Sequence, residues 1–237
     1  MIRRLHESVS GAGLTLLLLG VLLSSLRLSG AEVSASDAVL DAWLKATGNL
    51  ATLEARVVQT RHLKALRQPL VSTGRVWFAT PGRFRWELGE PPRSVAVRSG
   101  EDLLVLSPGL HRAERHRLDP AAEGPVKELL GLLDVGFPRD AAEFRARFDV
   151  LEVRTNAAAT TLRLRPRAAA ARRMMPGVSV DLGLGDWRLL ATEMTFADGS
   201  RLRSEFSAMI TNAPVDPARF RTEVPEGWKT ETRGGGR

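Results

Sequence analysis

Apolar and polar residues alternate along most of the chain after its N-terminal region, which predicts β-strands rather than helices. The clearest run is Arg83–Leu88, where Phe84, Trp86 and Leu88 point one way and charged side chains the other. A strand with one buried and one solvated face has this pattern. Turn-forming pairs such as Asp198-Gly199 separate neighbouring runs. The sequence therefore predicts about ten or eleven short strands joined as a meander.

The expected strands are short and share this period of two. Residues 168–175, between two of these strands, are predicted to be a basic, alanine-rich loop. The predicted fold class is mainly β (α+β). A sheet with so many strands should curl into a barrel or half-barrel with an apolar interior. Ten strands are expected at residues 53–59 (extendable to 66), 74–79, 83–88, 95–97, 103–106, 148–154, 160–165, 178–184, 187–196 and 201–208, and residues 110–118 and 220–224 are further strand candidates.

Helical periodicity interrupts the strand pattern in a few places. Residues 36–47 predict a short amphipathic helix, and Asp216–Arg219 predicts a single helical turn. In the middle of the chain, Pro125–Asp134 places Val126, Leu129, Leu130 and Leu133 on one stripe, and residues 140–148 begin as a second short helix. The stripe fits either a crossover helix packed on a sheet or an apolar lid over a cavity.

The N-terminus has the three parts of a secretory signal peptide. Arg3 and Arg4 precede an apolar stretch at residues 13–23, and small residues around Ala31 and Ala35 offer cleavage sites. An uncleaved anchor would need about 20 apolar residues, more than this stretch has. We therefore expect an exported protein with a signal peptide at residues 1–31, cleaved after Ala31 or Ala35. One domain at residues 32–230 and a flexible tail at residues 231–237 would follow.

Composition narrows the possible functions. The chain has 237 residues, enough for one sizeable domain, and no cysteine, which excludes disulfides, thiolate metal sites and cysteine nucleophiles. The formal charge is +7, of which the first 31 residues carry +2, and subtraction leaves +5 for the rest. The arginines are spread over the strands and tyrosine is absent, so nucleic-acid binding is not expected.

No group of residues predicts chemistry. His62 stands alone, and His111 and His116 would lie on opposite faces of a strand. Ser107 lacks the pattern of a catalytic serine, and no glycine-rich phosphate loop follows a strand. We therefore expect no catalytic site, no metal, no cofactor and no enzymatic activity.

The strongest signal is the set of apolar strand residues that alternation assigns to the interior. They form either a packed core or the lining of a binding cavity, because both require the same alternation. The set comprises Val76, Phe78, Phe84, Trp86, Leu88, Val95, Val97, Leu104 and Leu106.

One stretch of this set resembles a known family. Residues 74–87 (GRVWFATPGRFRWE) are similar to the signature of the LolA family of periplasmic outer-membrane lipoprotein carriers: an apolar strand, an aromatic pair, a proline turn, then Phe-x-Trp. Residues 98–108 resemble the family's next hairpin. The closing pattern is similar at Asp198-Gly199, Asn212, Asp216, Phe220 and Pro225–Gly227.

The resemblance implies an incomplete antiparallel β barrel under an α-helical lid, here Leu129, Leu130, Leu133 and Phe137. It implies a monomer in the periplasm whose cavity accepts lipoprotein acyl chains from an inner-membrane transporter and passes them to an outer-membrane receptor. Acyl chains in water cost about 0.8 kcal/mol per CH₂, so such cargo needs a shield.

One position departs from the family pattern. The family places an arginine before the turn proline, where it hydrogen-bonds the lid and favours closure, and Thr80 stands at this latch position before Pro81. Threonine donates one hydrogen bond rather than a fork of five N–H groups. A carrier for another lipid or acylated product, or a lipid-binding sensor or interaction module, therefore stays open beside the lipoprotein carrier.

Overall fold

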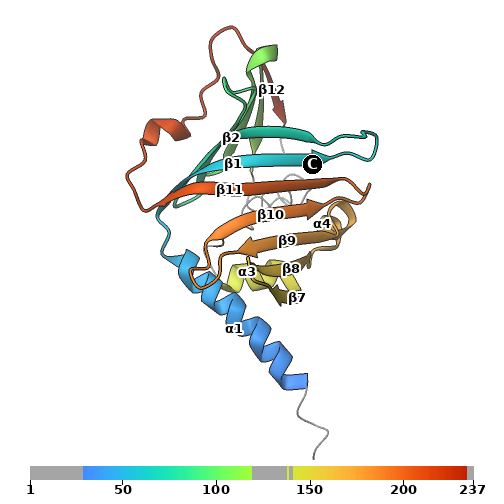
Figure 1. Cartoon of the computed structure of the whole chain (residues 1–237). Coiled ribbons are helices and arrows are strands. Elements are labelled where there is room, and N and C mark those ends of the chain that lie inside the picture. The colour runs from blue at the N-terminus through green and yellow to red at the C-terminus, as the bar shows by residue number, and fades with distance from the viewer. Residues whose placement is uncertain (1–28, 119–137, 139–140, 234–237) are drawn as a thin grey trace, which may run out of the picture. The chain divides into compact units, whose positions relative to one another are not determined.

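The computed structural model describes residues 29–118, 138 and 141–233. The chain divides into two units, Met1–Ala38 and Val39–Arg237, and the second contains the sheet and is described by itself. Its strands form one twelve-stranded sheet in the order β12-β6-β5-β4-β3-β2-β1-β11-β10-β9-β8-β7 (Figure 1). All neighbouring pairs are antiparallel except β12 and β6. The two edge strands do not pair with each other, which confirms the predicted mainly β fold with an incomplete barrel.

The strands form two meanders, β1 to β6 and β7 to β11, which β1 and β11 join. Their bounds are β1 (Thr52–His62), β2 (Leu70–Ala79), β3 (Arg83–Leu88), β4 (Ser94–Ser99), β5 (Asp102–Ser107), β6 (Arg112–Arg117), β7 (Phe148–Thr155), β8 (Thr160–Pro166), β9 (Gly177–Leu182), β10 (Leu189–Thr195), β11 (Arg201–Thr211) and β12 (Lys229–Arg233). The helices are α1 (Ser29–Gly48), η1 (Pro108–Leu110), α3 (Ala141–Arg147), α4 (Ala169–Met174) and η3 (Pro217–Phe220).

Some predicted elements need correction. Residues 169–174 form α4 instead of a loop, since this turn buries Ala171. Residues 220–224 are not a strand: η3 ends at Phe220, and the last strand is β12, which takes in residues 231–233 of the predicted tail. The strand expected at residues 178–184 ends earlier, since β9 stops at Leu182 and Leu184 beyond it is exposed. No helix in the described part of the chain is long and apolar enough to cross a membrane.

One face of the sheet, called the core face below, buries most of the apolar side chains. Directly paired residues of adjacent strands share a face, and pairing places Leu53 of β1 beside Phe78 of β2, and Phe78 beside Phe84 of β3. The same face continues through β11 to β7 and includes Phe206, Val180 and Leu162.

The C-terminal half of α1 packs against the core face. Leu40, Trp43 and Leu44 are buried in its cluster. Trp43 meets Phe144 of α3 edge-on, with ring centroids 5.4 Å apart, and Phe144 lies 5.2 Å from Phe148 at the start of β7. These aromatic contacts hold α1 and α3 to the β7 end of the core face.

The opposite face is covered over β2 to β5 by the chain segment between β11 and β12, residues 212–228, called the C-terminal strap below. Phe220 and Val215 of the strap pack on Trp77. Val224 and Trp228 pack farther along, on side chains of β4 to β6. Strands β4 and β5 are therefore apolar on both faces, whereas β3 keeps Arg85 and Glu87 on the strap side. In β2 to β6 the buried side chains under the strap are Trp77, Ala79, Val95, Val97, Leu104, Leu106 and Ala113.

Candidate functional site

The structure divides the nine predicted interior residues between the two faces of the sheet. Five belong to the core face: Val76, Phe78 and Phe84 are buried there, and Trp86 and Leu88 pack against them. Four lie on the opposite face under the C-terminal strap: Val95, Val97, Leu104 and Leu106. The expectation that all nine share one interior is therefore wrong.

Strand register gives the reason for this division. Val97 pairs with Arg85, whereas Trp86 pairs with Ala96. The side chain of Arg85 points away from Phe84 and Trp86, as the alternation in β3 predicted, so Val97 lies on the face opposite to Trp86. The β3–β4 connection pairs Leu88 with Ser94, and this pairing decides which residues of β4 share the face of Trp86. The interior residues of β4 and β5 on the core face are thus Ala96, Leu103 and Val105.

Sequence reasoning missed these three residues because β4 and β5 are apolar on both faces. Every residue of Leu103–Leu106 is apolar, so alternation alone cannot assign a face. The tight turn that pairs Ser99 with Asp102 shows which residues of β5 share a face with which residues of β4. It does not show which of these two sets shares the face of Trp86, because that depends on the register between β3 and β4.

The core face offers apolar contact with few polar groups. Trp86 meets Phe206 edge-on at 5.9 Å between ring centroids, and Phe78 lies 6.0 Å from Phe84. The indole nitrogens of Trp43 and Trp86 are buried and find no hydrogen-bond partner among the described residues. A buried donor left unpaired costs about 1–3 kcal/mol, so these two N–H groups are available to an acceptor that enters the core face.

The core face becomes polar at β6. His116 pairs with Leu103 and Glu114 with Val105, so both side chains share the core face. The Nε2 atom of His116 lies 3.8 Å from a carboxylate oxygen of Glu114. This pair gives the apolar surface a polar margin on the β6 side.

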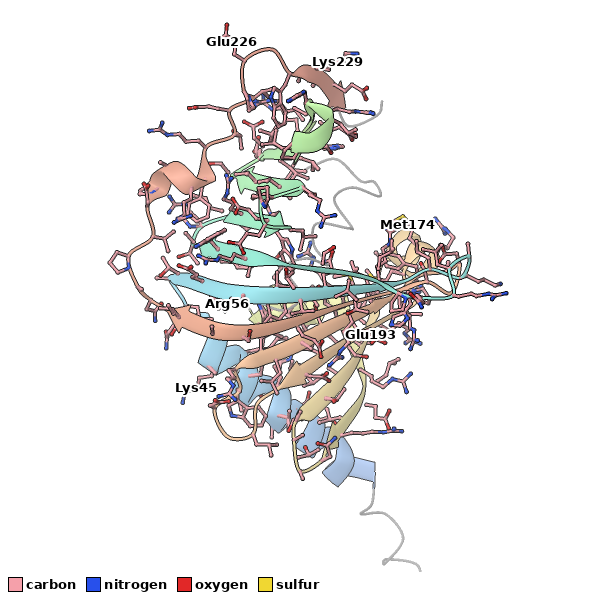
Figure 2. All side chains as sticks on the ribbon, turned by 45° about the horizontal axis from the view of Figure 1, so that its top comes forward. Lys45, Arg56, Met174, Glu193, Glu226 and Lys229 are labelled. Atoms are coloured by element: carbon pink, nitrogen blue, oxygen red, sulfur yellow. The ribbon has the colours of Figure 1, made fainter. Side chains whose placement is uncertain are left out.

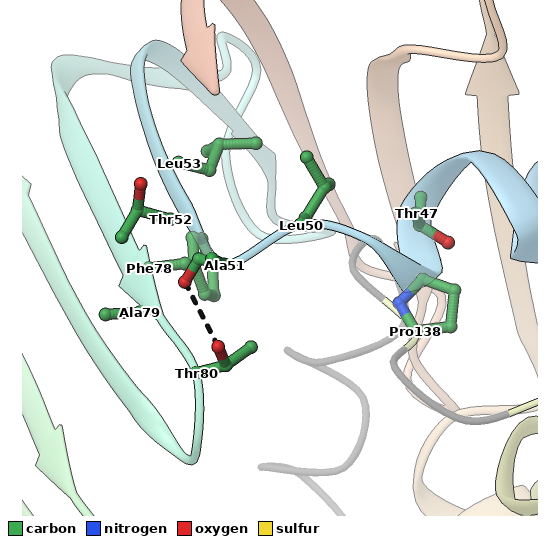
Figure 3. A pocket seen from close by; sticks show the side chains of 9 residues that line it. All are labelled: Thr47, Leu50, Ala51, Thr52, Leu53, Phe78, Ala79, Thr80 and Pro138. Carbon is green, nitrogen blue, oxygen red and sulfur yellow. Dashed lines mark hydrogen bonds between the residues drawn. The ribbon is translucent and has the colours of Figure 1, made fainter. Parts of the chain in front are cut away.

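Thr80 lies where α1, β1 and β2 meet, beside a small pocket (Figure 3). Its hydroxyl donates to the carbonyl oxygen of Ala51 at 3.2 Å, and its backbone N–H donates to the same oxygen at 2.9 Å. The pocket holds about 30 Å³, room for one water molecule. Its lining residues are Thr47, Leu50, Ala51, Thr52, Leu53, Phe78, Ala79, Thr80 and Pro138.

Comparison with known proteins identifies the family. The model of the family described as outer membrane lipoprotein carrier protein LolA matches residues 48–223. The chain belongs to the LolA family. The match runs from the last residue of α1 to residue 223 within the C-terminal strap, so it includes both faces of the sheet and omits β12.

Two relatives with assigned names agree with this membership. The outer-membrane lipoprotein carrier protein of Alkalilimnicola ehrlichii is 30% identical over 200 residues, which cover 80% of this chain and 81% of the relative. That of Chromohalobacter salexigens is 28% identical over 163 residues, 68% of this chain and 71% of the relative. A solved putative outer membrane lipoprotein-sorting protein domain from Vibrio parahaemolyticus superposes with a TM-score of 0.45 at 12% identity, over 76% of this chain and 94% of the domain.

The residues that LolA-family resemblance assigns to the lid, Leu129, Leu130, Leu133 and Phe137, lie outside the described residues. The described residue nearest to them on the C-terminal side is Pro138, which is buried and lines the pocket beside Thr80. The latch position and the chain that adjoins the expected lid therefore meet at one place.

Proposed function

We propose that this LolA-family protein carries the acyl chains of lipoproteins through the periplasm toward the outer membrane, held against the core face. The observation that carries the proposal is the continuous apolar surface of that face from β5 to β7, in a chain whose family is described as outer membrane lipoprotein carrier protein LolA. Proteins of this family are carriers rather than enzymes, and the proposal needs no cofactor.

The physical basis is the transfer of hydrocarbon out of water. Each buried CH₂ of an acyl chain gains about 0.8 kcal/mol, so a cargo with several chains needs a large apolar surface. The proposed lining is the core-face set Val76, Phe78, Phe84, Trp86 and Leu88. An ester or amide carbonyl at the head of an acyl chain would accept a hydrogen bond from the unpaired indole N–H of Trp86.

Loading requires that groups now packed on the core face move. Trp43 fills part of it, together with Phe144, so cargo competes with these side chains for the same surface. A lid formed by Leu129, Leu130, Leu133 and Phe137 would open to admit chains and close over them. A carrier of this kind works by shifting between two states of similar free energy.

The proposal includes the route. The signal peptide at residues 1–31 would be removed on export, leaving the domain at residues 32–230 as a periplasmic monomer. An inner-membrane transporter would load it and an outer-membrane receptor would unload it. Of the nine residues predicted from the sequence, only the five on the core face belong to the proposed binding site, because Val95, Val97, Leu104 and Leu106 lie under the strap.

A second cargo deserves a test because of Thr80. Its hydroxyl donates to Ala51 of its own sheet, and a threonine lacks the five donors with which the family's arginine holds the lid. A latch that holds the lid less firmly would suit a different lipid or acylated product, which could leave the protein by exchange with its surroundings.

The test is mass spectrometry of the organic extract of protein purified from its native host. We expect acylated peptides or other acyl lipids in the extract, and their masses distinguish the two cargoes. Trp86→Ala should reduce the extracted lipid, whereas Trp228→Ala, the matched change on the opposite face, should not. An extract free of acyl chains would overturn both versions, and equal losses in the two variants would remove the core face from the proposal.

A further inference from the structure

The hairpin between β1 and β2 carries exposed apolar side chains at its tip. Leu66, Leu70 and Val71 are 46%, 51% and 59% exposed. The backbone N–H of Leu66 donates to the carbonyl of Leu63 at 3.0 Å, which closes the turn, and Pro69 follows it. Other exposed large apolar residues, such as Leu110 and Leu151, lie on separate elements, so within the described part of the chain such residues cluster at the tip.

The same hairpin carries only positive charge. Arg61, Lys64 and Arg67 are exposed between and beside the leucines, and no aspartate or glutamate occurs from residue 55 to residue 86. In the described part of the chain, no ion pair or side-chain hydrogen bond engages Lys64 or Arg67. Their charges are therefore available to an external anion.

Two neighbouring elements add cations at the same end of the sheet, and the β10–β11 turn also adds one carboxylate, Asp198, which acts on Arg61. His62 of β1 pairs with Arg201, the first residue of β11. The β10–β11 turn contacts α4, since the N–H of Ala197 donates to the carbonyl of Met174 at 2.9 Å. Met174 accordingly lies near the hairpin in Figure 2, and the last turn of α4 brings Arg172 and Arg173.

We propose that this basic tip, residues 61–71 together with Arg172, Arg173 and Arg201, docks the protein on the surface of a bilayer that contains anionic phospholipids. Cations interleaved with exposed leucines are what an interfacial segment presents: the cations meet lipid phosphates and the leucines enter the headgroup–acyl boundary. An acidic protein partner would match the cations equally well, but it would not require three exposed apolar side chains among them.

This role goes beyond acyl-chain carriage and does not depend on it. The tip lies on the β1–β2 hairpin, at the end of β1 opposite Leu53 and the Thr80 pocket, because Leu53 pairs with Phe78 and Arg61 with Leu70. Docking through the tip would therefore leave the pocket end of the core face away from the membrane contact.

The test is binding of the full chain, as isolated from its host, to phosphatidylglycerol–phosphatidylethanolamine vesicles and to phosphatidylcholine vesicles. We expect binding to the anionic vesicles that weakens as salt screens the charges. The double change Lys64→Glu with Arg67→Glu should weaken binding about tenfold or more. The double change Leu66→Ser with Leu70→Ser should weaken it by a similar factor.

Two control variants make the same number of charge or apolar changes at exposed residues outside the tip. Arg93→Glu with Arg221→Glu, and Leu110→Ser with Leu151→Ser, alter exposed residues outside the tip and should leave vesicle binding unchanged. Equal binding to both vesicle types, or a leucine variant that binds as tightly as the parent, would overturn the proposal. The second result would point to an acidic protein instead. Cargo extracted from the same variants reports separately on the carrier function.

Discussion

The guanidinium carbon of Arg219 lies 4.6 Å from the ring centroid of Trp77. Trp77 is buried on β2, and Arg219 belongs to the C-terminal strap, so this cation–π contact joins the strap to the sheet. Two arginines of the sheet also hold the strap: Arg85, the cross-strand partner of Trp77, donates to the carbonyl of Arg219 at 3.2 Å, and Arg115 donates to that of Thr222 at 2.7 Å.

Replacing Arg219 by alanine should therefore loosen the strap. We expect the free energy of unfolding to fall by about 1 kcal/mol, the range for a partly exposed cation–π pair, as measured by denaturant titration. Limited proteolysis should cut the strap faster. Arg221→Ala is the control, because Arg221 is exposed and, among the described residues, makes no cation–π contact. Equal effects of the two changes would argue against the role of Trp77.

Gly74 should resist substitution because β3 approaches it closely. A Cβ atom at this position would lie 1.8 Å from the carbonyl oxygen of Glu87, so the paired strands would have to separate. We expect Gly74→Ala to cost about 1–3 kcal/mol or more of stability. Gly109→Ala, where a Cβ would meet nothing within 4 Å, should be nearly neutral in the same thermal denaturation measurement.

Thr80→Arg should restore the family's latch and slow the release of cargo. Thr80 is exposed, so the longer side chain can be accommodated without disturbing the core. The measurement is the rate at which a fluorescent acyl chain leaves the protein. Thr80→Val, which removes the hydroxyl's hydrogen bond to Ala51 and keeps that of the backbone N–H, should leave that rate near the parent value. If Thr80→Arg also leaves it unchanged, the latch does not act through this position.

Leu129→Glu or Leu133→Glu should lower cargo binding and leave folding largely intact, because a charge on a lid disfavours contact with acyl chains. Circular dichroism and lipid extraction together test this. Unfolding of either variant would instead make the stripe part of the core and contradict the lid.

The pKa of the Asp198 carboxyl is lowered by hydrogen bonds from Ser200, first from its hydroxyl and then from its backbone N–H, at 2.6 and 2.9 Å. A carboxyl with a lowered pKa stabilises the fold above its ordinary value of about 3.9, and this contribution is lost as pH falls through the folded value. Ser200→Ala should raise the pKa of Asp198 toward the ordinary value, as measured by NMR titration. An unchanged pKa would contradict this assignment.

Some of the fold and part of the site could be predicted. Alternation located β3 at its observed bounds, Arg83–Leu88, because its charged face and its aromatic face differ sharply. It also assigned Phe84 and Trp86 correctly to the same face. The prediction failed for α4, because its alanines and arginines show no apolar periodicity. The helix depends on the burial of Ala171 and of Met175, which follows it, and only the folded structure shows this burial.

The sequence by itself determined that this is a mainly β protein of the LolA family, since the positions of strands and turns follow from local alternation and the family signature is a contiguous run of residues. Only the tertiary structure decided which face Val95, Val97, Leu104 and Leu106 occupy. The physical reason is that their face is covered by the strap, a segment distant in the chain. Both faces of β4 and β5 are therefore covered, and these strands lack the regular alternation with polar residues that identifies the outer face of β3.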